Sequence, residues 1–240
     1  MNKPLVVVTG ASSGIGESIA REFSKKGHSL LLLARRIEKL EEMNLPNTMC
    51  RKVDVTDYKS FCSAVEEAVI AYGPVDCMIN NAGVMLLGAL DIQDPKEWTN
   101  MLNVNVLGLM NGMQTVLSSM KEKHSGTVIN ISSIAGRKTF PNHAAYCGTK
   151  FAVHAISENV REEVADDNVR VITIAPGPVE TELLSHTTSD EIKDGYDVWK
   201  DEIGGALKSI DVANTVLFAY EQPQNVCIRE IVIAPTRQQP

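Results

Sequence analysis

The chain alternates short, unbroken apolar runs with longer stretches in which apolar residues recur every three or four positions. Unbroken runs rich in β-branched residues are typical of parallel strands buried on both faces, and the three-to-four spacing is typical of amphipathic helices. The apolar runs predict strands over residues 5–8, 29–34, 48–53, 75–79, 127–131, 169–174 and 226–234. The periodic stretches predict helices over residues 15–27, 37–43, 58–71, 95–124, 144–166 and 210–220.

Strands that alternate with helices predict an α/β fold with a parallel sheet of about seven strands and helices on both faces. The chain contains no linker, low-complexity tract or internal repeat beyond this alternation, so we expect a single doubly wound domain over residues 1–240. The pattern breaks down over residues 182–209, which are polar and rich in turn formers. We expect this stretch to be an irregular substrate loop or lid.

Composition narrows the class of protein without identifying a reaction. The 240 residues are 44% hydrophobic and 22% charged, which is ordinary for a globular protein. A net charge of −7 predicts no binding of nucleic acid or of an anionic membrane, and no apolar run approaches the ~18 residues of a membrane-spanning helix. The five cysteines have no metal-binding spacing, so we expect no metal site, reduced thiols and a cytoplasmic location.

A glycine-rich turn, Gly10-x3-Gly14-x-Gly16, joins the first predicted strand to the first predicted helix. Glycines allow a phosphate to approach the backbone, and the free N–H groups at a helix N-terminus point towards the anion. The spacing differs from the commoner Gly-x-Gly-x-x-Gly pattern, and tight packing alone is the alternative explanation. We expect a Rossmann-type dinucleotide cradle made by Gly10, Ser12, Ser13, Gly14, Ile15 and Gly16.

Two arginines follow the second predicted strand, where a cofactor with a free ribose 2′-hydroxyl usually meets a carboxylate. Arg35 and Arg36 instead favour a 2′-phosphate, because guanidinium groups bind phosphate bidentately. We therefore expect NADP(H) to be preferred over NAD(H), with Arg35 the better candidate since it lies closer to the strand end. The alternative is that one or both arginines are solvated residues that open the helix over residues 37–43.

Short polar segments follow the next two predicted strands. Asp54, beside Val55, could accept a hydrogen bond from an adenine amino group, or it could only shape a turn. Asn81, Ala82 and Gly83 form a small turn suited to packing against a flat ligand, although Asn81 could instead tie neighbouring strands together. We expect all five residues to border the cofactor.

Tyr146 and Lys150 lie one turn apart on a predicted helix and are the main candidates for chemistry. An ammonium ~5 Å away, at an effective dielectric of ~20, favours the phenolate by roughly 3 kcal/mol, so we expect the pKa of Tyr146 to fall by about two units. Ser133 follows a predicted strand and could bond the same reacting oxygen. A Tyr and a Lys also occur four apart on helices by chance.

Asn103 and Asn105 interrupt the apolar face of the predicted helix over residues 95–124. A buried amide needs hydrogen-bond partners, and it often marks a helix kink or a bound water.

Taken together, these positions resemble the short-chain dehydrogenase/reductase family. The matching positions are Thr9-Gly10-x3-Gly14-x-Gly16, Asn80–Gly83, Asn105, Ser133, Tyr146-x3-Lys150 and Pro176-Gly177. The resemblance implies NAD(P)-dependent oxidoreduction of an alcohol or carbonyl, with Tyr146 as general acid or base and Ser133 polarising the carbonyl. It implies that Lys150 lowers the pKa of Tyr146 and bonds the nicotinamide ribose, and that Asn105 holds a water that links Lys150 to solvent. The residues it implies beside the nicotinamide are Pro176, Gly177, Val179 and Thr181.

Within that family the chain looks most like NADP-dependent reductases of 3-hydroxy acids and related compounds, because of Ala34-Arg35-Arg36 and residues 229–237. A small hydroxy or keto compound is the expected substrate, and Arg137 and Lys138 either attract its charge or are exposed loop residues.

Two alternatives are a reductase of 3-oxoacyl thioesters on a carrier protein and a catalytically silent NADP-binding regulator. The first is weakened because residues 225–230 replace the Asp-Gly-Gly turn of many such reductases. Cys147 is expected to be a small buried filler. The family also implies a homo-oligomer, a dimer or tetramer, that pairs the helices matching residues 101–122 and 144–166.

Overall fold

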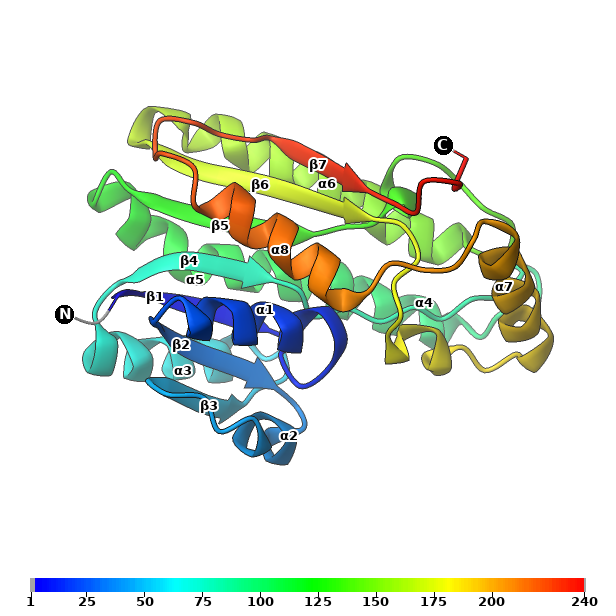
Figure 1. Cartoon of the computed structure of the whole chain (residues 1–240), viewed down its shortest axis with the longest axis horizontal. Helices are drawn as coiled ribbons and strands as arrows, with labels where there is room; N and C mark the ends of the chain where they lie inside the picture. Colours follow the sequence, from blue (N-terminus) through cyan, green and yellow to red (C-terminus); the bar gives the residue numbers. More distant parts are fainter. Residues whose placement is uncertain (1–2, 240) are drawn as a thin grey trace.

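A computed structural model describes residues 3–239 and contains one parallel sheet with the strand order β3-β2-β1-β4-β5-β6-β7 (Figure 1). The strands are β1 (Lys3–Thr9), β2 (His28–Ala34), β3 (Thr48–Lys52), β4 (Val75–Asn80), β5 (Gly126–Ile131), β6 (Val169–Pro176) and β7 (Glu230–Ile233). The α-helices are α1 (Gly14–Lys25), α2 (Ile37–Glu42), α3 (Tyr58–Tyr72), α4 (Pro95–Leu102), α5 (Gly108–Glu122), α6 (Ala144–Glu163), α7 (Asp190–Glu202) and α8 (Ser209–Tyr220). The predicted doubly wound α/β fold is confirmed.

Helices cover both faces of the sheet: α1 and α8 lie against one face, and α3, α5 and α6 lie against the other (Figure 1). The side chains of β1 alternate between these two layers, with Val6 and Val8 in the first and Leu5 and Val7 in the second. All four are fully buried. The unbroken apolar run in the sequence therefore reflects a strand with no solvent-facing side.

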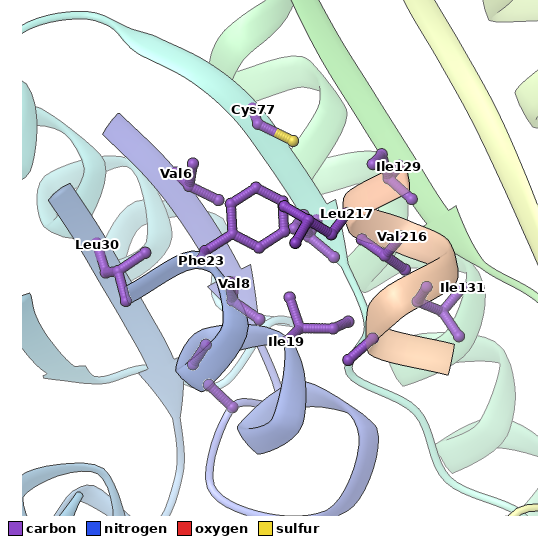
Figure 2. Packing of buried hydrophobic residues seen from close by; sticks show 14 of the residues in the cluster. Val6, Val8, Ile19, Phe23, Leu30, Cys77, Ile129, Ile131, Val216 and Leu217 are labelled. Atoms are coloured by element: carbon purple, nitrogen blue, oxygen red, sulfur yellow. The ribbon is translucent and has the colours of Figure 1, made fainter. Parts of the chain in front are cut away.

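The α1–α8 layer is held together by aromatic and aliphatic side chains of both helices. Figure 2 shows Phe23 of α1 and Leu217 of α8 close together over the sheet, with Ile19 nearby. Phe23 is fully buried, and burial of such a side chain contributes about 2–3 kcal/mol. This packing fixes α1, and hence the glycine turn from which α1 begins.

The predicted helix over residues 95–124 is interrupted. A π-helical turn, η1 (Asn103–Leu107), separates α4 from α5 and holds the buried side chain of Asn105. Such turns insert an extra residue into the helical repeat and often occur at functional sites. The polar residue on the apolar face is therefore the point at which the helix changes its register.

The prediction of an irregular stretch over residues 182–209 was wrong. This stretch contains a 3-10 turn, η4 (Glu182–His186), and the helix α7, whose N-cap Ser189 accepts a hydrogen bond from the backbone N–H of Ile192. No residue of α7 is fully buried, so its sequence is mostly polar. Its apolar face is reduced to Ile192, Tyr196 and Trp199, because the fourth apolar residue of the helix, Val198, is exposed.

Two predicted boundaries also moved. β7 begins at Glu230 rather than at residue 226, because its pairing with β6 begins there. α6 ends at Glu163 rather than at residue 166 and is followed by a 3-10 turn, η3 (Ala165–Asp167).

Candidate active site

A cavity of about 910 Å³ opens at the carboxyl ends of the strands, beyond the point where β1 and β4 lie side by side. The connections from β1 and β4 leave in opposite directions there, which is where open α/β sheets bind their ligands. Almost all of the predicted site residues line this cavity. Gly16 and Asn105 are the two that do not, and both are buried behind its wall.

The glycine turn is a tight cradle whose shape depends on missing side chains. Gly10 and Gly14 have φ angles of 63° and 56°, in the left-handed region that favours glycine. A Cβ on Gly16 would lie 2.4 Å from the carbonyl oxygen of Gly10, and one on Gly14 would lie 3.0 Å from Cγ2 of Thr181. The turn therefore keeps a bare backbone facing the cavity at the N-terminus of α1, as a bound phosphate requires.

Asn81 ties the end of β4 to the end of β1, as one of its two expected roles required. Its Nδ2 donates to the carbonyl oxygens of Thr9 and Gly10 at 2.9 and 3.2 Å, while its backbone N–H donates to Oγ1 of Thr9 at 3.0 Å. Asn81 also lines the cavity with Ala82 and Gly83. The structural role and the position beside a ligand are thus combined in one residue.

Arg35 and Arg36 are both exposed and both line the cavity. The guanidinium of Arg36 donates to the hydroxyl of Ser13 at 2.8 Å and forms an ion pair with Glu182 at 2.9 Å. The hydrogen bond that Arg36 donates to Glu182 lowers the pKa of the Glu182 carboxyl. Arg36 therefore links the glycine turn to η4, with a carboxylate in the place where a phosphate oxygen could bind.

Asp54 and Val55 line the same end of the cavity. Oδ1 of Asp54 accepts hydrogen bonds from the backbone N–H and the hydroxyl of Thr56, at 3.0 and 2.8 Å. The carbonyl oxygen of Val55 accepts from Nδ2 of Asn111 at 2.8 Å. Asp54 therefore shapes the turn through Oδ1, and its other carboxylate oxygen, Oδ2, takes no part in these two hydrogen bonds.

Ser133 and Tyr146 meet across the cavity floor. Ser133 follows β5 and caps a 3-10 turn, η2 (Ile134–Gly136), by accepting from the backbone N–H of Ala135 at 3.1 Å. Tyr146 lies in the first turn of α6 and is buried. Burial raises the pKa of Tyr146 above its ordinary value, and a hydrogen bond from Ser133 acts in the opposite direction.

The expectation that Lys150 lowers the pKa of Tyr146 is not met in this structure. Nζ of Lys150 lies 5.8 Å from the ring centroid of Tyr146 and donates to the carbonyl oxygen of Ile131 at 3.1 Å. Burial lowers the pKa of Lys150 to about 8. Desolvation, which the sequence does not reveal, is the largest influence on both groups and disfavours the charged form of each.

Asn105 uses both groups of its amide inside the protein. Oδ1 accepts from the backbone N–H of Val84 at 2.8 Å, and Nδ2 donates to the carbonyl oxygen of Val84 at 2.9 Å and to Oγ1 of Thr149 at 3.1 Å. Oγ1 of Thr149 in turn donates to the carbonyl oxygen of Tyr146 at 2.7 Å. Asn105 thus connects the cavity wall to the helix turn that carries Tyr146, and Thr149 is a member of this network that the sequence analysis missed.

Pro176, the last residue of β6, lines the cavity, as do Gly177, Val179 and Thr181 in the segment that follows. The backbone N–H of Gly177 donates to the carbonyl oxygen of Ile233 at 2.8 Å, which ties this segment to β7. A Cβ on Gly177 would lie 2.2 Å from Oε1 of Gln238, so the C-terminal segment packs directly behind the segment after β6. No signal in the polar tail of the sequence indicated that contact.

The far end of the cavity is lined by aromatic side chains that the sequence analysis did not single out, among them Phe140, His143, Tyr196 and Trp199. Arg137 and Lys138 are not part of this lining. Arg137 forms an ion pair with Glu230 at 2.5 Å, and Nζ of Lys138 lies 5.4 Å from the ring centroid of Phe140.

Among residues 3–239, no helix is long and apolar enough to cross a membrane. The same residues contain no group of three or more His, Cys, Asp or Glu side chains placed to hold a metal ion. Cys147 is buried in α6, as expected of a filler.

The family model described as short chain dehydrogenase matches residues 4–192. The chain is 36% identical to an uncharacterized oxidoreductase of Staphylococcus saprophyticus, over 98% of this chain and 96% of the relative, and 37% identical to one of Listeria monocytogenes, over 98% and 97%. The chain therefore belongs to the short-chain dehydrogenase family, a class of oxidoreductases, and the predicted family is confirmed.

Solved structures agree with this assignment. A serine dehydrogenase in its closed form, complexed with NADP+, superimposes with a TM-score of 0.89 at 30% identity, covering 98% of this chain and 96% of that one. ElxO with NADP bound gives a TM-score of 0.87 at 28% identity, covering 98% of each chain.

Proposed function

We propose that the chain transfers a hydride between NADP(H) and the carbonyl or alcohol group of a small keto or hydroxy compound. The observation that carries the proposal is that one cavity joins a glycine cradle and two arginines to the hydrogen-bonded pair Ser133 and Tyr146, with Lys150 beside them. The NADP complexes of structurally similar proteins support the choice of cofactor.

The cofactor would lie along the cavity from the arginines to Tyr146. The bare backbone of Gly10–Gly16 fits a diphosphate, Arg35 and Arg36 fit a 2′-phosphate, and Asp54 has a carboxylate oxygen for an adenine amino group. When bound, the reduced nicotinamide would supply the hydride that a carbonyl carbon accepts.

Tyr146 would serve as the proton donor for reduction. Because burial keeps its pKa high, its phenol is protonated at neutral pH and can give a proton to a carbonyl oxygen that has gained negative charge. The hydroxyl of Ser133, which bonds the same phenol, would donate to that oxygen and stabilise its charge. In the direction of alcohol oxidation the roles reverse, and Tyr146 must first lose its proton.

Lys150 and Asn105 would act beside this pair. The ammonium of Lys150, 5.8 Å from the ring centroid of Tyr146, would bond the ribose of the cofactor and would stabilise a phenolate in the oxidative direction. Asn105 would act as a positioning residue, through Val84 on one side and through Thr149 and the backbone of Tyr146 on the other. The water that the family resemblance implies at Asn105 stays a prediction.

A screen for consumption of NADPH across keto acids, keto esters, aldehydes and sugars tests the proposal. We expect turnover of at least one class, with NADPH used in preference to NADH. Binding of NADPH without turnover of any carbonyl class would instead favour the catalytically silent regulator, and turnover confined to acyl thioesters would favour the carrier-protein reductase.

We also propose that the protein assembles with copies of itself. Large apolar side chains are exposed on the helices that the resemblance expects to pair. Leu102 ends α4, Leu107 lies in η1, Met110 lies in α5 and Phe151 lies in α6. Exposed apolar patches of this kind mark protein contacts. Light scattering should therefore give a dimer or tetramer rather than a monomer.

A further inference from the structure

A series of rings lines the cavity from Tyr146 out to α7. Neighbouring ring centroids are 6.3 Å apart for Tyr146 and His143, 5.5 Å for His143 and Phe140, 6.3 Å for Phe140 and Trp199, and 5.3 Å for Trp199 and Tyr196. All five residues are lining residues. In a chain with only 5 Phe, 5 Tyr and 2 Trp, this is a concentration of aromatic surface beside the proposed reacting oxygen.

The rings of Phe140, Tyr196 and Trp199, called the ring wall below, are only partly buried and line the cavity. No residue of α7 is fully buried, and Tyr196 and Trp199 each keep part of their surface accessible. Successive rings are tilted or edge-on to one another, and together they form an aromatic surface that lines the cavity. A flat apolar group on a ligand can pack edge-to-face or offset against rings arranged in this way.

The same end of the cavity offers almost no positive charge. Of its described lining residues, Lys150 is the one basic side chain near the rings, since Arg35 and Arg36 lie at the opposite end beside the glycine turn. Burial lowers the pKa of His143, so its imidazole is neutral at pH 7. The exposed carboxylate of Glu191 adds a negative charge.

A carboxylate on the substrate would therefore lose its hydration without gaining a cation of its own. Burial of an unpaired carboxylate is strongly unfavourable. The two cationic side chains nearby have other partners. Arg137 forms an ion pair with Glu230, and Nζ of Lys138 lies over the ring of Phe140. Neither lines the cavity.

Resting on the proposed function, we propose that the substrate is an uncharged carbonyl compound that carries an aryl or similarly flat apolar group, and not a keto acid. The carbonyl carbon accepts the hydride that NADPH supplies, the C=O π bond breaks, and the carbonyl oxygen takes the proton of Tyr146. The aryl group lies against the ring wall of Phe140, Tyr196 and Trp199. The sequence predicts a small hydroxy or keto compound as substrate, and the scarcity of positive charge beside the ring wall restricts that prediction to uncharged compounds.

Three compounds separate the parts of the proposal: ethyl benzoylformate, its acid benzoylformate, and ethyl pyruvate. The first two differ in charge, while the first and third differ in the aryl group. We expect kcat/KM for ethyl benzoylformate to exceed that for benzoylformate by at least about 100-fold, and that for ethyl pyruvate by about 10-fold. A kcat/KM for benzoylformate equal to or above that of its ester would overturn the inference and leave the proposed function standing.

Binding measurements cover the case in which none of the three is reduced. Calorimetry in the presence of NADP+, which cannot donate a hydride, gives the affinity of each compound without turnover. Tighter binding of the aryl ester than of the acid, with no reduction, supports the ring-wall inference and counts against the proposed function. Equal affinities, or no binding of the ester, would overturn the inference itself.

Trp199→Ala tests the wall directly, with Val198→Ala as the matched control, since Val198 is exposed on the same helix and does not line the cavity. We expect Trp199→Ala to lower the kcat/KM ratio of ethyl benzoylformate to ethyl pyruvate by about 10-fold, and Val198→Ala to leave it unchanged. If the Trp199→Ala protein shows no cooperative thermal unfolding, and so is not folded, Trp199→Leu, which keeps apolar volume at this position, replaces it in the test. An unchanged ratio in a folded Trp199 variant would contradict the inference.

Discussion

Ser133 hydrogen-bonds the phenol of Tyr146. Burial raises the pKa of that phenol, and the hydrogen bond with Ser133 lowers it. The two influences have opposite signs, and burial is the larger. The site described here therefore holds a protonated phenol at neutral pH, which suits proton donation in carbonyl reduction. Deprotonation, needed for alcohol oxidation, is the harder state to reach.

The direction of this pKa shift predicts different pH profiles for the two reactions. A raised pKa keeps the donor form populated throughout the neutral range, so kcat for reduction should be level from about pH 6 to about pH 8. The base form grows as pH approaches the raised pKa, so kcat for alcohol oxidation should rise with pH across the same interval and beyond.

Ser133→Ala removes the hydrogen bond that lowers the pKa of Tyr146, so that pKa should rise further. The oxidation profile of the variant should shift to higher pH in addition to losing rate. An oxidation profile that is level in the neutral range, or that shifts to lower pH in the variant, would be inconsistent with the assigned signs.

Burial of Lys150 carries a cost in stability that pH should reveal. Its pKa is lowered from 10.5 to about 8, so between those pH values the unfolded chain binds more protons than the folded one. The free energy of unfolding should therefore rise with pH from about 8 to about 10.5, and the charged lysine costs about 3 kcal/mol below pH 8.

Lys150→Met should remove that dependence. Loss of the hydrogen bond to the carbonyl oxygen of Ile131 costs about 1 kcal/mol, so urea unfolding at pH 7 should show a net gain of about 2 kcal/mol. Lys59→Met, on the exposed face of α3, is the control and should change stability little. Loss of stability at pH 7 in the Lys150 variant alone would refute this explanation.

The sequence predicted the sheet well because each buried strand is an unbroken apolar run, as at residues 5–8. Through the resemblance to the family, it also predicted that the glycine turn, Ser133, Tyr146 and Lys150 belong to one site, and these residues line one cavity. It could not predict the raised pKa of Tyr146, since burial depends on the whole fold rather than on the spacing to Lys150.

α7 was missed for a different physical reason. An exposed helix needs only one apolar face, and here that face is three residues, Ile192, Tyr196 and Trp199, in a polar segment. Contacts between distant segments were also out of reach, as with Gln238 behind Gly177.

Cofactor preference should depend on Arg35 and on the carboxylate that pairs with Arg36. Arg35→Ala should weaken NADPH binding by about 10-fold and NADH binding far less, because only NADPH carries the 2′-phosphate. Glu182→Gln should tighten NADPH binding by about 3-fold, since it frees the guanidinium of Arg36 and removes a negative charge. Calorimetric Kd values measure both, and equal effects on the two cofactors would place the 2′-phosphate elsewhere.

The most direct measurement is turnover of the Tyr146→Phe variant, which keeps the ring and removes the hydroxyl group that would donate the proton in the proposed reduction. We expect kcat for NADPH-dependent reduction to fall by at least about 1000-fold while the Kd for NADPH stays within about 3-fold of the unaltered protein. Tyr58→Phe, which removes an exposed hydroxyl on α3, should leave kcat unchanged. A Tyr146→Phe protein that binds NADPH and reduces its substrate at the original rate would contradict the central claim.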